Sequence, residues 1–228
     1  KILKYISVIG AILVILLFYF NQRNILIDKV NSIKNVHSII YGLFAAIAVI
    51  LIISILKNNY EIDRLFLMII IPIGLIYTLL IPPGIVPDEW VHMHSALSLS
   101  SQIMQKETND KVTMRVEEHE LYSRQVSIPD NGYYDYVYNN VFSISENNEY
   151  VNIEVESVSL GQIFAYFPAA IGITIARLFN LGGVTTIYMG RLFNFVYYTI
   201  VTYFALKKIP FGKLLLFAIT MLPMTCHQ

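Results

Sequence analysis

Residues 65–92 read LFLMIIIPIGLIYTLLIPPGIVPDEWVH. The first part, Leu65 to Leu80, carries no charge and is close to the length that an α-helix needs to cross about 30 Å of hydrocarbon. Pro82-Pro83-Gly84 then ends the helix, because proline and glycine both break helical structure. The charged residues Asp88 and Glu89 follow at once. The stretch therefore predicts a membrane helix that leads directly into a polar segment.

The composition of the whole chain is that of an integral membrane protein. Of its 228 residues, 56% are hydrophobic and only 14% are charged, whereas about a quarter of the residues in a soluble domain are charged. The formal net charge is zero, so nothing indicates a basic surface for nucleic acid. The single cysteine, Cys226, cannot form an internal disulfide, and we interpret it as a packing residue.

The apolar residues gather in about six runs of near membrane-spanning length. We expect spans at residues 2–20, 39–56, 65–80, 160–179 and 186–206, and a last one that begins near Leu214. No signal-peptide cleavage site follows the first run, so we interpret it as a retained helix. The sequence starts without Met and stops inside the last run, so we expect a longer, C-terminally truncated protein. The predicted fold is an all-α integral membrane protein, a polytopic helix bundle.

Residues 82–158 form a large polar loop between the third and fourth expected spans. Most of the 16 acidic residues lie in it, which makes it too polar for lipid, and connections of this length are usually functional. Residues 88–105 predict a short amphipathic helix. The alternation of Val151, Ile153 and Val155 with polar residues predicts short strands. We therefore expect a partly ordered domain in this loop.

The distribution of Lys and Arg does not show which side of the membrane each loop occupies. With the spans given above, the Lys and Arg residues of the short loops divide equally between the two sides of the membrane. The positive-inside rule then gives no preference. Long polar loops cross the membrane largely regardless of their charge, so the acidic loop does not decide the orientation either.

The strongest candidate site is Asp88-Glu89-Trp90-Val91-His92-Met93-His94. On a helix, Asp88 and His92 are one turn apart, and Glu89 shares a face with His92. A carboxylate beside an imidazole can act as a general base or ligate a metal. A metal site needs three or four ligands, so this spacing neither implies nor excludes a divalent metal. The alternative interpretation is that Asp88 or Glu89 caps a helix that begins near Pro87.

Two polar segments of the loop also have candidate roles. In residues 131–140 tyrosines alternate with Asn and Asp, a pattern that suits sugar binding and equally suits a strand at a lipid interface. His119 lies between Glu118 and Glu120, which indicates a solvated face.

Two arginines lie near the ends of expected membrane helices. Arg177 and Arg191 are at positions where an arginine usually extends its side chain to the lipid interface. An arginine that faces a cavity could instead bind an anionic lipid phosphate. The sequence favours the first of these interpretations.

Four stretches occur in an order that resembles a known group of proteins. They are Pro87-Asp88-Glu89 with His92 and Ala96, Tyr166-Phe167-Pro168-Ala169-Ala170-Ile171-Gly172, Gly190-Arg191-Leu192-Phe193-Asn194, and Leu222-Pro223-Met224-Thr225-Cys226-His227-Gln228. This order is similar to that of a family of uncharacterised bacterial multi-pass membrane proteins that is grouped with the GT-C glycosyltransferases. The resemblance covers about residues 65–228. Residues 1–64, with the first two expected spans, lie outside it.

The resemblance implies a GT-C-like membrane module in the bacterial plasma membrane, with the loop 82–158 on the extracytoplasmic side. In GT-C enzymes an acid near the membrane acts as general base on the acceptor, and a polyprenyl-phosphate-linked sugar is the donor. Carried over, Asp88 would be the base, with Glu89 as its partner and His92 assisting. The residues that would bind substrate are His94, Tyr166, Arg177, Arg191 and Gln228. The implied partners are a lipid-linked sugar donor, membrane lipids and a cell-envelope glycan or lipid acceptor.

Two other function classes compete with this hypothesis. A transporter or flippase of lipid-linked saccharides would carry charges in mid-helix and inverted repeats, and the sequence shows no repeat and few such charges. A non-catalytic envelope assembly protein would bind sugar or peptide through its loop. The substitution Asp88→Asn separates it from an enzyme, since only an enzyme loses its function.

Overall fold

The computed structural model describes residues 34–58, 60–86, 88–106, 112–124, 131–145, 149–154 and 163–221. These residues are mainly helical and belong to two compact units. Unit 1 comprises Lys1–Leu80 and Tyr198–Gln228, and unit 2 comprises Ile81–Tyr197. The expected span at residues 2–20 and the candidate residue Gln228 lie outside the described residues.

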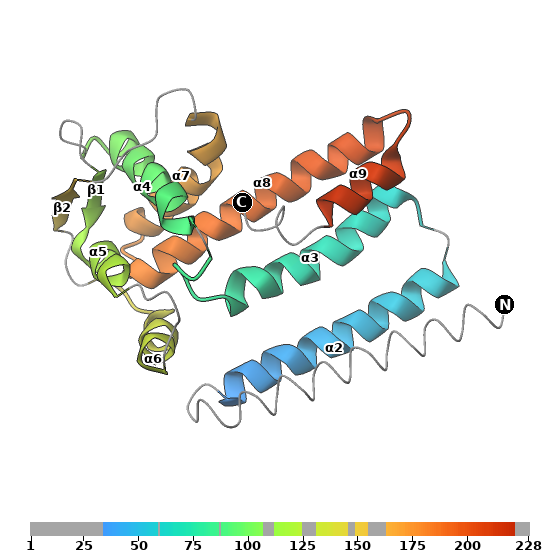
Figure 1. The fold of residues 1–228 in the computed structure, drawn as a ribbon, viewed down its shortest axis with the longest axis horizontal. Helices are drawn as coiled ribbons and strands as arrows, with labels where there is room; N and C mark the ends of the chain where they lie inside the picture. The colour runs from blue at the N-terminus through green and yellow to red at the C-terminus, as the bar shows by residue number, and fades with distance from the viewer. Residues whose placement is uncertain are drawn as a thin grey trace. The chain divides into compact units, whose positions relative to one another are not determined.

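Unit 1 contains the helices α2 (Lys34–Lys57), α3 (Ile62–Leu80) and α9 (Lys213–Thr220), with the end of α8 (Gly183–Lys208). Helix α3 packs against both α2 and α9 (Figure 1). The hydroxyl of Tyr198 in α8 donates to the carbonyl of Thr220 at 2.6 Å. Among the described residues one helical segment, Ile62–Leu79, is long and apolar enough to cross a membrane. Where the structure describes them, the apolar runs from residue 39 onward are helical.

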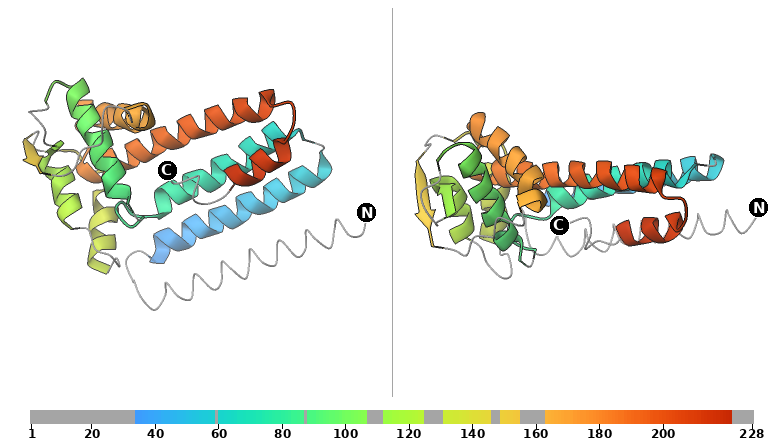
Figure 2. Two further views of the ribbon diagram at one scale, coloured as in Figure 1. Left: turned by 45° about the horizontal axis from the view of Figure 1, so that its top comes forward. Right: turned by 90° about the horizontal axis from the view of Figure 1, so that it is seen from above.

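Unit 2 contains the elements of the polar loop and the two helices that follow it. In chain order these are α4 (Glu89–Ile103), β1 (Val112–Arg115), α5 (Val116–Ser123), α6 (Asn131–Asn140), β2 (Tyr150–Ile153), α7 (Ile163–Leu178) and the start of α8. The two strands pair antiparallel, with Val112 opposite Ile153 and Arg115 opposite Tyr150. Helices α4 and α7 lie side by side (Figures 1 and 2). The predicted helix at 88–105 and the predicted strand near residue 151 are confirmed.

The core of unit 2 forms because α4 presents an apolar stripe. Trp90, Met93 and Leu97 recur at helical spacing and are buried, as expected for one face of an amphipathic helix. Against this stripe pack apolar side chains from the strand, from α6 and from α7. The cluster includes Val112, Val137 and Ile173 among others. The elements of unit 2 therefore share one apolar core, to which α7 and the start of α8 contribute.

Helix α6 corrects one interpretation of the tyrosine-rich segment. Residues Asn131–Asn140 form a helix, so the strand interpretation is wrong. Tyr133 and Val137 are both buried, and their i, i+4 spacing puts them on one helical face. Tyr134, Tyr136 and Tyr138 occupy every second position, as in a strand, but the buried residues Tyr133 and Val137 are four positions apart, as in a helix.

Helices α7 and α8 approach each other closely at two glycines. A Cβ atom on Gly172 of α7 would lie 2.4 Å from the carbonyl oxygen of Met189 in α8. A Cβ atom on Gly190 would lie 3.2 Å from Cγ1 of Ile173. Small residues allow helix backbones to come this close. Two of the four stretches that carry the resemblance, residues 166–172 and 190–194, therefore meet where α7 crosses α8.

Candidate functional site

Arg191 of α8 holds the turn that precedes α4. Its Nε donates to Oε1 of Glu89 at 2.5 Å, and the two side chains are only 14% and 11% exposed. Its Nη1 donates to the carbonyl of Ile81, and its Nη2 donates to the carbonyl of Pro82 at 3.1 Å. The second oxygen of Glu89 accepts the backbone N–H of Gly84 at 2.7 Å. The Glu89–Arg191 ion pair thus holds the backbone of the turn at Ile81 and Pro82, through Arg191, and at Gly84, through Glu89.

Packing holds the same turn from its other side. Gly84 has a φ of 79°, and a Cβ atom there would lie 2.3 Å from Nε1 of Trp90, so only glycine fits. The hydroxyl of Tyr133 donates to the carbonyl of Pro83. Burial raises the pKa of the Tyr133 hydroxyl above its usual value, and the negative charge of Glu89 raises it further. Tyr133 therefore stays protonated as a hydrogen-bond donor.

Asp88 lies at the exposed N-terminus of α4 in an unusual conformation. Its φ of 60° and ψ of 2° are left-handed, and its carboxylate makes no capping hydrogen bond. Its backbone carbonyl accepts the N–H groups of Val91 and His92. A left-handed residue other than glycine costs about 1–3 kcal/mol and is often found at functional sites. Asp88 is the N-cap residue of α4 and Glu89 lies in its first turn, as the capping interpretation expects, although the Asp88 side chain makes no capping hydrogen bond.

His92 connects this helix end to α7. Its Nδ1 lies 2.9 Å from the hydroxyl of Tyr166, at hydrogen-bond distance, and the two ring centroids are 5.8 Å apart. His92 is exposed and lies one helical turn after Asp88. The structure therefore brings together four of the candidate residues, Glu89 with Arg191 and His92 with Tyr166, around the turn that carries Asp88.

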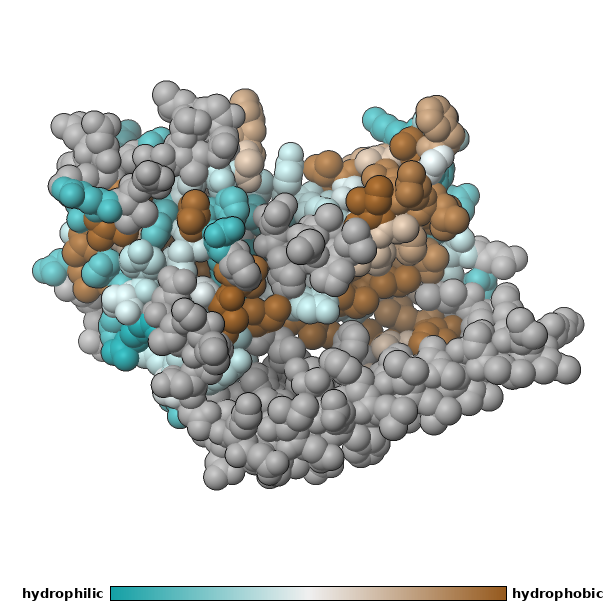
Figure 3. Space-filling view, viewed as in Figure 1, coloured by the Kyte–Doolittle hydropathy of each residue, from teal (hydrophilic) through white to brown (hydrophobic). Residues whose placement is uncertain are grey.

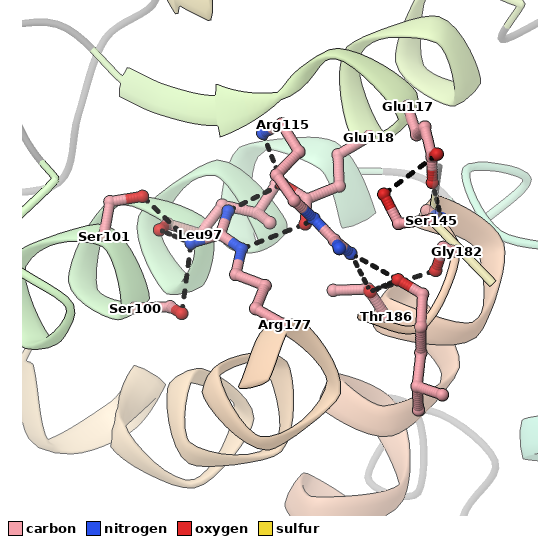
Figure 4. A network of polar contacts seen from close by, with 12 residues as sticks. Leu97, Ser100, Ser101, Arg115, Glu117, Glu118, Ser145, Arg177, Gly182 and Thr186 are labelled. Carbon is pink, nitrogen blue, oxygen red and sulfur yellow. Dashed lines mark hydrogen bonds and ion pairs between the residues drawn. The ribbon is translucent and has the colours of Figure 1, made fainter. Parts of the chain in front are cut away.

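A second cluster lies in the interior of unit 2 (Figure 4). Oε1 of Glu118 accepts from Nε of Arg115 at 3.0 Å and from Nε of Arg177 at 2.9 Å. Oε2 accepts from Nη2 of Arg177 at 2.6 Å and from the backbone N–H of Arg115 at 2.9 Å. All three side chains are fully buried. Burial alone would raise the pKa of the Glu118 carboxyl, but Arg177 and Arg115 together hold it below its ordinary value.

The two arginines extend this cluster to the surrounding helices. Nη1 of Arg177 donates to Oγ of Ser101 in α4 at 2.9 Å. Nη2 of Arg115 donates to the carbonyl of Leu181 at 2.6 Å and to Oγ1 of Thr186 in α8 at 2.7 Å. The cluster therefore joins α4, α5, α7 and the start of α8 through charged hydrogen bonds.

Two interpretations from the sequence are wrong. Glu118 is not on a solvated face, because its carboxylate is the buried partner of two arginines. Arg177 and Arg191 do not extend their side chains to a lipid interface, because each is paired with a glutamate of the loop. Both pairings join residues far apart in the sequence, so no local pattern could have indicated them.

Two other substrate-binding candidates are not at this surface. His94 is 2% exposed, and its ring packs 4.7 Å from that of Tyr122 and 5.9 Å from that of Trp90. Arg177 is equally enclosed. Both side chains therefore lie in the interior of unit 2. Within the described ranges no group of three or more His, Cys, Asp or Glu could hold a metal ion.

Because His94 is buried, we expect the stability of the protein to depend on pH. Burial lowers the pKa of its imidazole from 6.5 to about 4. Between these values the unfolded chain binds the proton and the folded protein does not. Stability should therefore fall as the pH drops below 6.5, by about 1.4 kcal/mol per pH unit at most. Thermal unfolding of the full-length protein in detergent, measured from pH 7 to pH 4, tests this.

The variant His94→Phe should remove this part of the acid sensitivity. His119→Asn, on the partly exposed face of α5, is the matched control and should keep the wild-type pH profile. The Glu118 carboxylate also contributes stability that is lost on acidification. Because its pKa lies below the ordinary value, this loss occurs at a lower pH than that of His94. Equal pH profiles for wild type and His94→Phe would contradict this role of His94.

Most of the chain matches a known family. The sequence profile of the family described as "Predicted membrane protein (DUF2142)" matches residues 71–228. No curated protein and no solved structure matches the chain. The matched region includes the turn held by Arg191 and the buried cluster around Glu118. We conclude that this chain belongs to the DUF2142 family of predicted membrane proteins.

Proposed function

We propose that this chain is a membrane glycosyltransferase of the GT-C type. It transfers a sugar from a polyprenyl-phosphate-linked donor to a cell-envelope glycan or related acceptor at the outer face of the bacterial plasma membrane. The observation that carries the proposal is the exposed Asp88 carboxylate, on a left-handed residue that directly precedes the paired Glu89. Backbone strain maintained by surrounding structure is a feature of active sites.

In the proposed reaction Asp88 is the general base. An acceptor hydroxyl gives its proton to the Asp88 carboxylate, and its oxygen forms a new bond to the anomeric carbon of the donor. The bond from that carbon to the phosphate oxygen breaks, and its electron pair leaves with polyprenyl phosphate. A positioned base of this kind contributes about 10²–10⁴-fold to the rate. Asp88 then returns the proton to solvent.

The neighbouring residues have different roles in this proposal. Glu89 is a positioning residue, because its two oxygens are engaged by Arg191 and by the N–H of Gly84. The exposed imidazole of His92, oriented by Tyr166, lies one helical turn from Asp88 and can hydrogen-bond an acceptor hydroxyl. The base and its assisting group therefore lie on α4, and the groups that orient them come from α7 and α8.

Complementation tests the role of Asp88. A bacterium that lacks the gene receives the full-length wild type, Asp88→Asn or Glu120→Gln, and the sugar composition of its envelope is measured. Glu120 is the matched control, an acid of α5 whose ion pair with Arg124 is half exposed. We expect wild type and Glu120→Gln to restore the missing sugar. Asp88→Asn should fail at an equal amount of protein in the membrane, and full restoration by Asp88→Asn would contradict the proposal.

A further inference from the structure

The fourth apolar run of the sequence becomes α7, which differs from a membrane-spanning helix in length. Its 16 residues extend about 24 Å at 1.5 Å per residue, less than the roughly 30 Å of hydrocarbon. The 19 residues of α3 extend about 28 Å, and the 26 residues of α8 about 39 Å. Of these three helices, α7 is the shortest within the described residues.

The side chains of α7 are enclosed by protein in the middle of the helix. From Pro168 to Arg177 no residue is exposed. The exposed large side chains are at its two ends, Phe164, Phe167 and Leu178. A helix that contacts lipid would expose its middle, because the middle lies at the apolar centre of the bilayer. The middle of α7 contacts protein instead.

Helix α8 shows the pattern that α7 lacks. In its second half, before the exposed Lys207 and Lys208, exposed large apolar and aromatic side chains recur at helical spacing: Val196, Tyr197, Ile200, Val201 and Phe204. Apolar side chains are also exposed on α3 and α9, while the surface over unit 2 is a mixture of hydrophilic and apolar side chains (Figure 3). Extended apolar surfaces are thus present on α3, α8 and α9.

The partner that encloses α7 is a polar helix. Helix α4 packs along α7, and Oγ of Ser100 lies 2.9 Å from Oγ1 of Thr174. Helix α4 also exposes His92 and Gln102, and Asp88 is exposed at its N-terminus. If α7 crossed the bilayer, α4 would have to enter the hydrocarbon with it, and a charge such as that of Asp88 is costly there.

We propose that α7 does not cross the membrane but belongs to an extramembrane domain, which is formed by the elements of unit 2 that precede α8. In this topology the chain crosses with α3 in one direction and returns in the other with α8, which is long enough to cross but less apolar than α3. The inference does not rest on the proposed enzymatic function, because it follows from the length, exposure and packing of the helices alone.

This topology also orients the protein. Since α3 leads into unit 2 and α8 leads out of it, Lys207, Lys208 and Lys213 lie on the same side of the membrane as Lys57 and Arg64. The positive-inside rule places such a group of cations in the cytoplasm. In the sequence analysis the Lys and Arg residues divided equally between the two sides of the membrane because α7 was counted as a span. The domain from α4 to α7 is then extracytoplasmic.

Cysteine labelling tests the proposal. In the full-length protein with Cys226→Ala, single cysteines replace Asn139 in α6, Phe179 after α7 and Lys208 at the end of α8, all exposed positions. A membrane-impermeant maleimide is applied to intact and to opened cells. We expect Asn139→Cys and Phe179→Cys to react in intact cells, and Lys208→Cys to react only after the cells are opened. The protein with Cys226→Ala alone is the unlabelled control.

Two results would overturn the proposal. If α7 spans the membrane, Phe179→Cys reacts from the side opposite to Asn139→Cys, and Lys208→Cys reacts from the same side as Asn139→Cys. If the orientation is wrong, Asn139→Cys and Phe179→Cys react only in opened cells. Leu178→Cys, also exposed, reports on the same turn if the Phe179 variant is not produced. A role of Asp88 in sugar transfer is measured separately, by complementation.

Discussion

Replacement of Glu118 by Gln is expected to destabilise the protein by about 3–5 kcal/mol, because it removes the anion from a buried ion cluster. Gln keeps the size of the side chain but leaves the charges of Arg115 and Arg177 in a fully buried site. Among the described residues Nη1 of Arg115 already has no hydrogen-bond partner. The other acceptors of the two arginines, which include the hydroxyls of Ser101 and Thr186 and the carbonyl of Leu181, are uncharged and do not replace the lost negative charge.

Thermal unfolding of the purified full-length protein measures this effect. Glu120→Gln is the control, since it removes an acid of the same helix whose ion pair is 51% and 47% exposed. Surface ion pairs of this kind contribute about 0–1 kcal/mol. An unfolding temperature for Glu118→Gln equal to that of Glu120→Gln would show that the buried cluster does not hold unit 2 together.

Replacement of Arg191 by Met is expected to reduce sugar transfer about 100-fold, the scale of a small misplacement of reacting groups. The substitution leaves Glu89 without its cation and removes the donors to the carbonyls of Ile81 and Pro82. The turn would then no longer hold Asp88 in its left-handed conformation. The complementation assay measures the loss of function.

Arg191→Lys is the matched variant for this prediction. Lysine keeps the charge, but its single nitrogen cannot reproduce the planar fork that contacts Glu89 and two carbonyls at once. We expect an activity between those of wild type and Arg191→Met. Wild-type complementation by Arg191→Met would rule out a positioning role for this ion pair.

Local sequence patterns predicted the elements that depend on local forces. The uncharged run that ends at Leu80 predicted α3, and the spacing of apolar residues after Asp88 predicted α4. The alternation around Val151 predicted β2. The same spacing correctly put Asp88 and His92 one turn apart on the surface of a helix. These features can be predicted from the period of the apolar residues and from the proline and glycine residues that end helices and strands.

The sequence could not show which distant charges meet. Glu118 and Arg177 are 59 residues apart, and Glu89 and Arg191 are 102 residues apart. Their pairing follows from tertiary packing, which no local period encodes. For the same reason an apolar run such as α7 has the same composition whether lipid or protein encloses it. The alternating tyrosines of α6 suggested a strand, although the spacing of Tyr133 and Val137 fits a helix.

Consumption of a lipid-linked sugar tests the central claim most directly. The purified full-length protein is placed in lipid vesicles with a labelled polyprenyl-phosphate sugar and an envelope-glycan fraction, and the release of polyprenyl phosphate is followed. We predict transfer of label to the glycan by wild type and Glu120→Gln, and a rate lower by about 10²–10⁴-fold for Asp88→Asn. Equal rates for wild type and Asp88→Asn, or no transfer from any donor of this class, would contradict the account.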